Sequence, residues 1–204
     1  TRGTINVRWN KLNFTIPDPH SPVRVIGMIP DQLTTKQLHE RLPVVDGFLT
    51  SCVDKDIVKL AVVERHFGTG RIGLGFVKGL GLKRGAIASS VAHDHHNIIV
   101  AGVDDESMAT AVQTIVNHQG GMVAVEGSTV LEALPLPIAG LMSDQPIEAV
   151  RDNLDRLSAA ARDLGTPGDP FMALSFLALP VIPSLKLTDL GLVDVDRFEI
   201  VGLY

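Results

Sequence analysis

Apolar residues along the chain fall mostly into short runs, bounded by glycine, proline and polar positions. Such runs predict buried strands, because a strand crosses a protein core in about four to eight residues. The runs lie at residues 23–29, 57–64, 86–92, 98–103, 121–125 and 129–134. The last two flank Glu126-Gly127-Ser128 and therefore predict a hairpin, and residues 185–188 alternate between apolar and polar side chains.

Helical spacing is clearest at residues 144–164. Apolar side chains recur there every three or four positions, at Ile147, Val150, Leu154, Leu157 and Ala161. Ser143 or Asp144 is expected to cap this helix, since its side chain can accept a first-turn N–H. Acidic residues at the start of 104–117 suit a helix N-terminus, and 31–41 is expected to hold a short helix.

Strands and helices therefore mix without strict β-α-β alternation. This pattern predicts an α/β protein: a mixed-sheet, layered α+β domain and not a complete TIM barrel. The polar, proline-bearing residues 1–22 are interpreted as a lead-in segment or the tail of a small flanking β-domain. Residues 23–204 are expected to form the main domain.

Composition narrows the classes of function. The 204 residues are 45% hydrophobic, enough for a sizeable core, and the net charge of −5 gives no attraction to nucleic acid or anionic membranes. The single cysteine, Cys52, excludes an internal disulfide and suits a reducing compartment. No signal peptide or apolar run of membrane-spanning length is visible. We expect a cytoplasmic protein with no nucleic-acid or membrane partner.

The sharpest local feature is the polar cluster Ser89-Ser90-Val91-Ala92-His93-Asp94-His95-His96-Asn97. It follows a predicted strand, and imidazole and carboxylate groups can bind metals such as Zn, Fe or Mn or carry protons. If strand geometry continues, His93 and His95 share one face, with Asp94 and His96 on the other. The alternative is a polar loop whose histidines form local hydrogen bonds.

Two neighbouring motifs are more ambiguous. Glu64-Arg65-His66 ends a predicted buried strand and could form an ion pair or contact a substrate, with the structural interpretation favoured. The glycine-rich residues 68–85 match neither a dinucleotide-binding nor a P-loop pattern. Their glycines are expected to permit tight turns and close backbone packing.

Several of these motifs resemble the C-terminal domain of bacterial and archaeal adenine deaminases, with a match from about Val23 to the C-terminus. The matching segments are Glu64 to Asn97 with its glycines, Leu134-Pro135-Leu136-Pro137-Ile138-Ala139-Gly140-Leu141-Met142-Ser143-Asp144, and Asp169 to Pro183 followed by Leu185-Lys186-Leu187-Thr188-Asp189. One position departs from the family pattern, which more often has serine where this chain has His95. His95 is therefore discounted as an essential ligand.

The resemblance implies a hydrolase that converts adenine and water to hypoxanthine and ammonia, in purine salvage or adenine catabolism. In this family an amidohydrolase barrel of about 250 residues holds a binuclear Mn or Fe centre with its principal metal ligands. We expect that barrel as partner, adenine as substrate, a homo-oligomer, and no metal or activity in this chain alone. His93, Asp94 and His96 are assigned auxiliary catalytic roles, and Ser89, Ser90 and Asn97 substrate contacts.

Two alternatives remain open at this point. The domain could be a structural or oligomerisation module that supports the barrel. It could also bind a metal independently through His93, Asp94 and His96. The His93-x-His95 pair mimics the metal-binding pair of amidohydrolase barrels, but too few histidines follow it to complete such a site. A zinc deaminase site of the His-x-Glu and Pro-Cys-x-x-Cys type is excluded, since Cys52 is the only cysteine.

Overall fold

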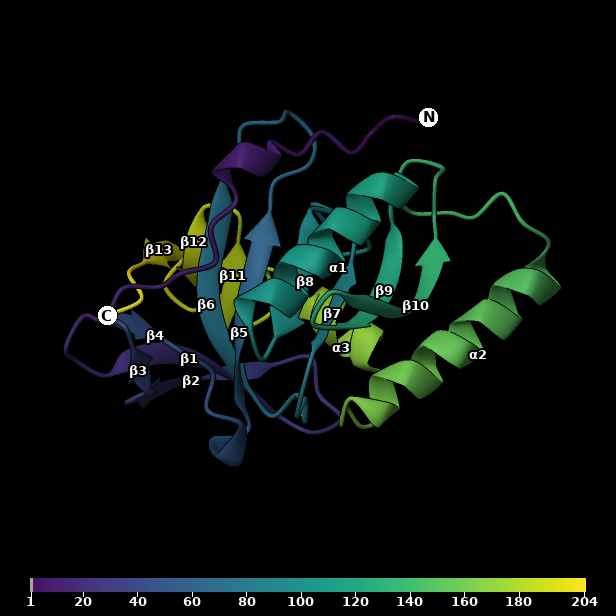
Figure 1. Cartoon of the computed structure of the whole chain (residues 1–204). Helices are drawn as coiled ribbons and strands as arrows, with labels where there is room; N and C mark the ends of the chain where they lie inside the picture. Colours follow the sequence, from purple (N-terminus) through teal and green to yellow (C-terminus); the bar gives the residue numbers. More distant parts are fainter. Residues whose placement is uncertain (1) are drawn as a thin grey trace.

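The computed structural model describes residues 2–204. They form three layers, with a large mixed sheet in the middle (Figure 1). The strands of this sheet follow the order β10 (Thr129–Pro135), β9 (Gly121–Glu126), β7 (Ala86–Ser89), β8 (Ile98–Gly102), β5 (Ile57–Val63), β6 (Ile72–Lys78), β1 (Val23–Met28) and β2 (Thr35–Glu40). Neighbours are antiparallel except for β1 and β6, which are parallel. The sheet is open, so the predicted layered α/β fold without a TIM barrel is confirmed.

One helix covers one face of the sheet and several elements cover the other. Helix α1 (Asp105–His118) packs on β7, β8 and β9, while α2 (Ile147–Asp163) packs on β9 and β10. The face opposite α1 also carries α3 (Pro170–Phe176) and a small antiparallel sheet of β11 (Leu185–Thr188), β12 (Gly191–Asp194) and β13 (Glu199–Val201). Short elements complete the chain: η1 (Trp9–Lys11), η2 (Val53–Lys55), β3 (Val44–Val45) and β4 (Phe48–Leu49).

The core lies on both faces of the central strands. All seven residues of β5 are buried, which explains the continuous apolar run that predicted it. Leu60 and Val62 belong to the cluster with α2, α3 and the small sheet, whereas Ala61 and Val63 belong to the cluster with α1. None of the helices in the described part of the chain combines the length and apolar composition needed to cross a bilayer.

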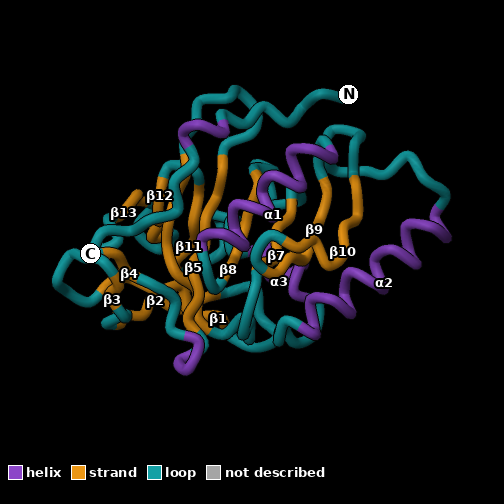
Figure 2. Tube along the Cα trace, viewed as in Figure 1, coloured by secondary structure: helices purple, strands orange, loops and turns teal. Residues whose placement is uncertain are grey.

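The N-terminal segment runs along the α1 side of the sheet with little regular structure (Figure 2). Its Ile5 and Phe14 side chains are buried in the same core cluster as α1, and β1 begins at Val23. The expected division between residues 1–22 and 23–204 stays a prediction.

Two sequence expectations are wrong in this part of the fold. The short helix expected within 31–41 is absent, because residues 35–40 form the edge strand β2 paired along its length with β1. Ladder hydrogen bonds to β1 and a buried Thr35 outweigh the weak helical pattern. Helix α2 begins at Ile147, after Pro146 and without a side-chain cap, so the capping role of Ser143 or Asp144 is also wrong.

The glycine-rich segment contains a strand that the sequence pattern concealed. Gly73 and Gly75 lie in β6 and face the small sheet. A Cβ atom on Gly73 would lie 1.8 Å from the carbonyl oxygen of Thr188. The missing side chain therefore lets β11 and β12 pack directly on the backbone of β6, as the expectation of close packing anticipated.

Candidate functional site

The polar cluster lies in the connection between β7 and β8, in the middle of the large sheet. Strand β7 ends at Ser89, and His93, Asp94 and His95 form a turn. The backbone N–H of His96 donates to the carbonyl oxygen of Ala92 (2.6 Å), which closes this turn. The expected alternation of His93 and His95 against Asp94 and His96 is therefore wrong, since adjacent antiparallel strands force the chain to reverse here.

All three predicted substrate contacts use their polar groups inside the chain. Ser89 Oγ accepts from Val91 N–H (2.9 Å), and Ser90 Oγ donates to Gly140 O (2.6 Å). Asn97 accepts from Arg65 N–H (3.2 Å) and donates to the Asp189 carboxylate (3.1 Å). Ser89, Ser90 and Asn97 are all buried. These bonds fix the two ends of the loop, and a direct contact with substrate stays a prediction.

His95 is also held from within. Its Nδ1 accepts the backbone N–H of Asn97 (3.0 Å), so the ring proton lies on Nε2, which donates to Ala178 O (3.0 Å). Burial lowers the pKa of His95 and favours this neutral form, although the bond to Ala178 acts in the opposite direction. His95 therefore ties the loop to the chain that follows α3.

His93, Asp94 and His96 differ from the rest of the cluster. The His93 ring packs on Phe176 and His96, with centroids 5.0 and 5.9 Å apart, and Asp94 is exposed. His96 Nδ1 accepts Ala92 N–H (3.2 Å), so Nε2 carries the proton of the neutral ring and has no hydrogen-bond partner among the described residues. Within residues 2–204, no hydrogen bond engages the side chains of His93 or Asp94. Burial, and then the neighbouring positive groups, lower the pKa of His96.

A buried carboxylate supports the loop from the end of β5. Glu64 is only 2% exposed. Its oxygens accept hydrogen bonds from the backbone N–H groups of His66 (2.5 Å), Phe67 (2.6 Å) and Thr69 (2.9 Å), and from the Thr69 hydroxyl (2.7 Å). Burial alone would raise the pKa of Glu64, but these bonds outweigh it and lower the pKa to about 2. The turn that they fix places His66 Nε2 2.7 Å from His95 O.

Arg65 joins three segments without a carboxylate partner. Its guanidinium donates to the carbonyl oxygens of His96, Ala139 (3.1 Å) and Thr4 (3.3 Å). In the described chain Arg65 and Glu64 form no ion pair and bind mainly backbone groups, and a contact with substrate stays a prediction. Burial lowers the pKa of Arg65. The buried guanidinium fills the space beside Gly140, where a Cβ atom would lie 2.8 Å from Nη1.

A second support, missed by the sequence analysis, reaches the loop through α3. Lys186 is fully buried, and its ammonium group donates to Leu33 O (2.8 Å) and Phe176 O (3.0 Å). Burial lowers its pKa to about 8. Because Phe176 contacts His93, Lys186 holds the end of α3 against the loop. Alternation in 185–188 gave no sign that this lysine faces inward.

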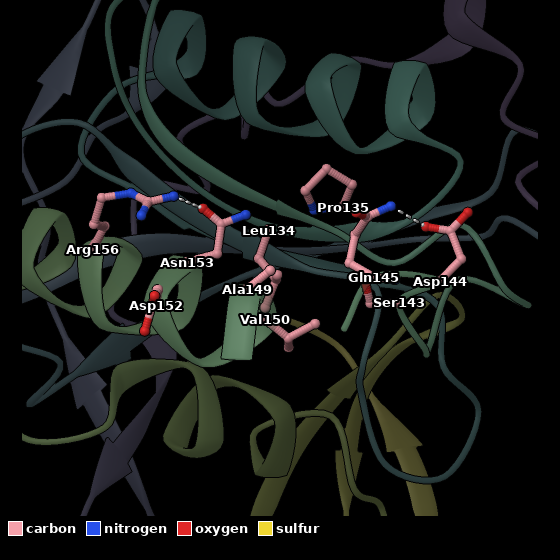
Figure 3. Close-up of a pocket in the computed structure, with 10 residues that line it drawn as sticks. All are labelled: Leu134, Pro135, Ser143, Asp144, Gln145, Ala149, Val150, Asp152, Asn153 and Arg156. Carbon is pink, nitrogen blue, oxygen red and sulfur yellow. Dashed lines mark hydrogen bonds between the residues drawn. The ribbon is translucent and has the colours of Figure 1, made fainter. Parts of the chain in front are cut away.

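The polar cluster lacks the ligand arrangement of a metal site, and a cleft lies elsewhere in the described chain. Within the described residues, no three His, Cys, Asp or Glu side chains are placed to hold a metal ion, so His93, Asp94 and His96 do not form a ligand set in this arrangement. A cleft of about 500 Å³ lies between β10, the 143–145 segment and α2, and contains none of the predicted site residues (Figure 3).

Comparison with known proteins accounts for most of the chain. The sequence model of the protein family described as adenine deaminase C-terminal domain matches residues 32–199. The chain is 54% identical over 98% of its length to an adenine deaminase of Desulfatibacillum aliphaticivorans, and 51% identical over 98% to one of Methanothrix thermoacetophila. It spans about a third (36%) of each of these curated relatives. The chain therefore belongs to the adenine deaminase C-terminal domain family.

Proposed function

We propose that this domain works within an adenine deaminase and presents His93, Asp94 and His96 to the mouth of the active site of a preceding amidohydrolase barrel. The observation that carries this proposal is the division within the polar loop. Ser89, Ser90, His95 and Asn97 are engaged inside the chain, whereas His93, Asp94 and His96 Nε2 are not engaged by the described residues.

The chemistry of the reaction explains why such groups would be useful. Replacing the amino group of adenine by water moves a proton from the attacking water to the departing ammonia. Imidazole groups carry protons efficiently near neutral pH. The lowered pKa of His96 favours the neutral ring, and because Nδ1 accepts Ala92 N–H, Nε2 carries the ring proton and can donate a hydrogen bond to the purine or to the departing amino group. Asp94, which is exposed, can accept a hydrogen bond from a purine N–H.

The metal centre belongs, in this proposal, to the barrel. The Mn or Fe ions implied by the family supply an activated water there, and the described residues of this chain offer no comparable ligand set. The role of the domain is then to orient adenine, hold a proton at His93 or His96, and exclude bulk water from the site.

An assay of ammonia release from adenine tests this function. The 204-residue chain and the longer enzyme are compared with added Mn²⁺ or Fe²⁺. We expect turnover only from the longer enzyme, because the metal ligands lie outside this domain. Turnover by the chain alone that is lost in His93→Ala would contradict the proposal and place a complete active site here.

Exposed apolar side chains favour self-association as a second role. Val130 and Leu131 lie on the edge strand β10, and Ile147 and Leu154 lie on α2, with exposures between 39% and 79%. An open edge strand with apolar side chains is a common site of pairing between copies. Sedimentation of the longer enzyme, with Leu131→Lys as the variant, is expected to show a lower oligomeric state if β10 forms the contact.

A further inference from the structure

Phe67 combines high exposure with a constrained backbone. Its side chain is 82% exposed, although its backbone N–H is bound to the buried carboxylate of Glu64 (2.6 Å). The neighbouring N–H groups of His66 and Thr69 bind the same carboxylate. A single exposed phenylalanine is ordinary on a protein surface. Here, however, the buried charge of Glu64 fixes the backbone of the turn, so the chain that carries the ring is held against the domain.

The chain enters the domain beside this turn. Asn6 N–H donates to Arg65 O (2.7 Å), and Asn6 Nδ2 donates to His66 O (3.0 Å). Arg65 Nη1 also lies 3.3 Å from both the carbonyl and the hydroxyl oxygen of Thr4. The N-terminal segment therefore runs against the connection between β5 and β6, which carries Phe67 (Figure 1).

The length of the relatives indicates what lies next to this surface. They are nearly three times as long as the chain, which matches their C-terminal domain. Most of their additional chain therefore precedes the segment equivalent to residues 4–6. Because that segment is bonded to Arg65 and His66, the preceding part of the enzyme approaches the domain at the turn that carries Phe67.

We propose that His66 and Phe67 form a docking surface for the part of adenine deaminase that precedes this domain, with Phe67 inserted into an apolar pocket of that part. This inference rests on the proposed function only in taking the domain to act within the longer enzyme. Since His66 Nε2 lies 2.7 Å from His95 O, contact at Phe67 would set the position of the histidine loop (residues 89–97) relative to the barrel. Aromatic side chains commonly anchor such contacts.

Site-specific photo-crosslinking in the full-length enzyme tests the docking surface. Phe67 is replaced by p-benzoylphenylalanine, and the crosslinked peptides are identified by mass spectrometry. Phe198 provides a matched control, because it is also an exposed phenylalanine (86%) and lies in the connection between β12 and β13. We expect position 67 to crosslink to peptides that precede this domain, at a yield several-fold above that of position 198.

Three results would overturn the inference. These are no crosslink from position 67 to the preceding part, equal yields from positions 67 and 198, or crosslinks from position 67 to a second copy of the domain. The readout does not require turnover of adenine. An enzyme that crosslinks as expected but keeps full activity in His93→Ala would therefore retain the docking surface and reject the proposed role of the histidines.

Discussion

Glu64 and Lys186 are buried charges that hold two different neighbours of the histidine loop, and within residues 2–204 neither has an oppositely charged partner. Glu64 fixes the turn whose His66 contacts the backbone of His95. Lys186 fixes the end of α3, whose Phe176 contacts the ring of His93. Both supports work by binding backbone groups, one through N–H donors and the other through carbonyl acceptors.

The two supports differ in whether hydrogen bonds or burial has the larger effect on the pKa of the charged group. Four donors surround Glu64 and lower its pKa to about 2, so the folded protein favours the charged carboxylate more than water does. Only two carbonyl groups accept from Lys186, and burial lowers its pKa to about 8, so the folded protein disfavours the charged ammonium. The charge of Glu64 thus stabilises the fold, whereas that of Lys186 is retained at a cost in stability.

The largest expected effect is that of Glu64→Gln. The amide NH₂ of the glutamine would face backbone N–H donors. We therefore expect the free energy of unfolding at pH 7, measured by urea denaturation, to fall by about 3 kcal/mol. The carboxylate contributes stability above pH 4.5, and this contribution is lost as pH falls from 4.5 through about 2. The stability of the variant should therefore not show this decrease between pH 4.5 and about 2. Glu148→Gln, on an exposed position, is the control; equal stability of the two variants would contradict the comparison.

Lys186→Met is expected to have a smaller effect at neutral pH. It removes the cost of the buried charge but leaves two carbonyl groups without a donor, for a net change within about 1 kcal/mol. The cost is fully present below pH 8 and is relieved as pH rises from about 8 to 10.5. The stability of the wild type relative to the variant should therefore increase across that window. A parallel pH dependence of the two proteins would show that Lys186 is not disfavoured as a cation.

His66→Ala is expected to have the smallest effect. His66 is exposed and makes one hydrogen bond to the loop, so its loss should cost about 0.5 kcal/mol. Because Phe176 holds His93, the NMR signals of the His93 ring should stay in place. A large shift of those signals would mean that the Glu64 support, and not the Lys186 support, positions His93.

The sequence predicts most strands of the large sheet, but it conceals the glycine-rich strand β6 and predicts a helix where the edge strand β2 lies. Residues 57–63 and 98–102 were found because both faces of their strands are buried, which produces continuous apolar runs. The strand Thr35–Glu40 was mistaken for a helix because it is an edge strand with a mostly polar sequence, and its structure depends on pairing with β1.

The histidine cluster could be identified from residue types, but the division of labour within it could not. Ser90, His95 and Asn97 are bound by Gly140, Ala178 and Asp189, which lie 50, 83 and 92 residues further along the chain. Local spacing contains no information about such partners. Lys186 was missed for the same reason, since both its acceptors lie outside the local alternation of β11.

The kinetics of His93→Ala and His96→Ala in the longer enzyme test the central claim most directly. The control is His39→Ala, an exposed histidine on the edge strand β2. We predict that each loop variant remains folded and loses about 100-fold in kcat/KM, the scale of a positioned acid–base group, while the control is unchanged. Wild-type kinetics in both loop variants would contradict the account and leave these histidines a purely structural role.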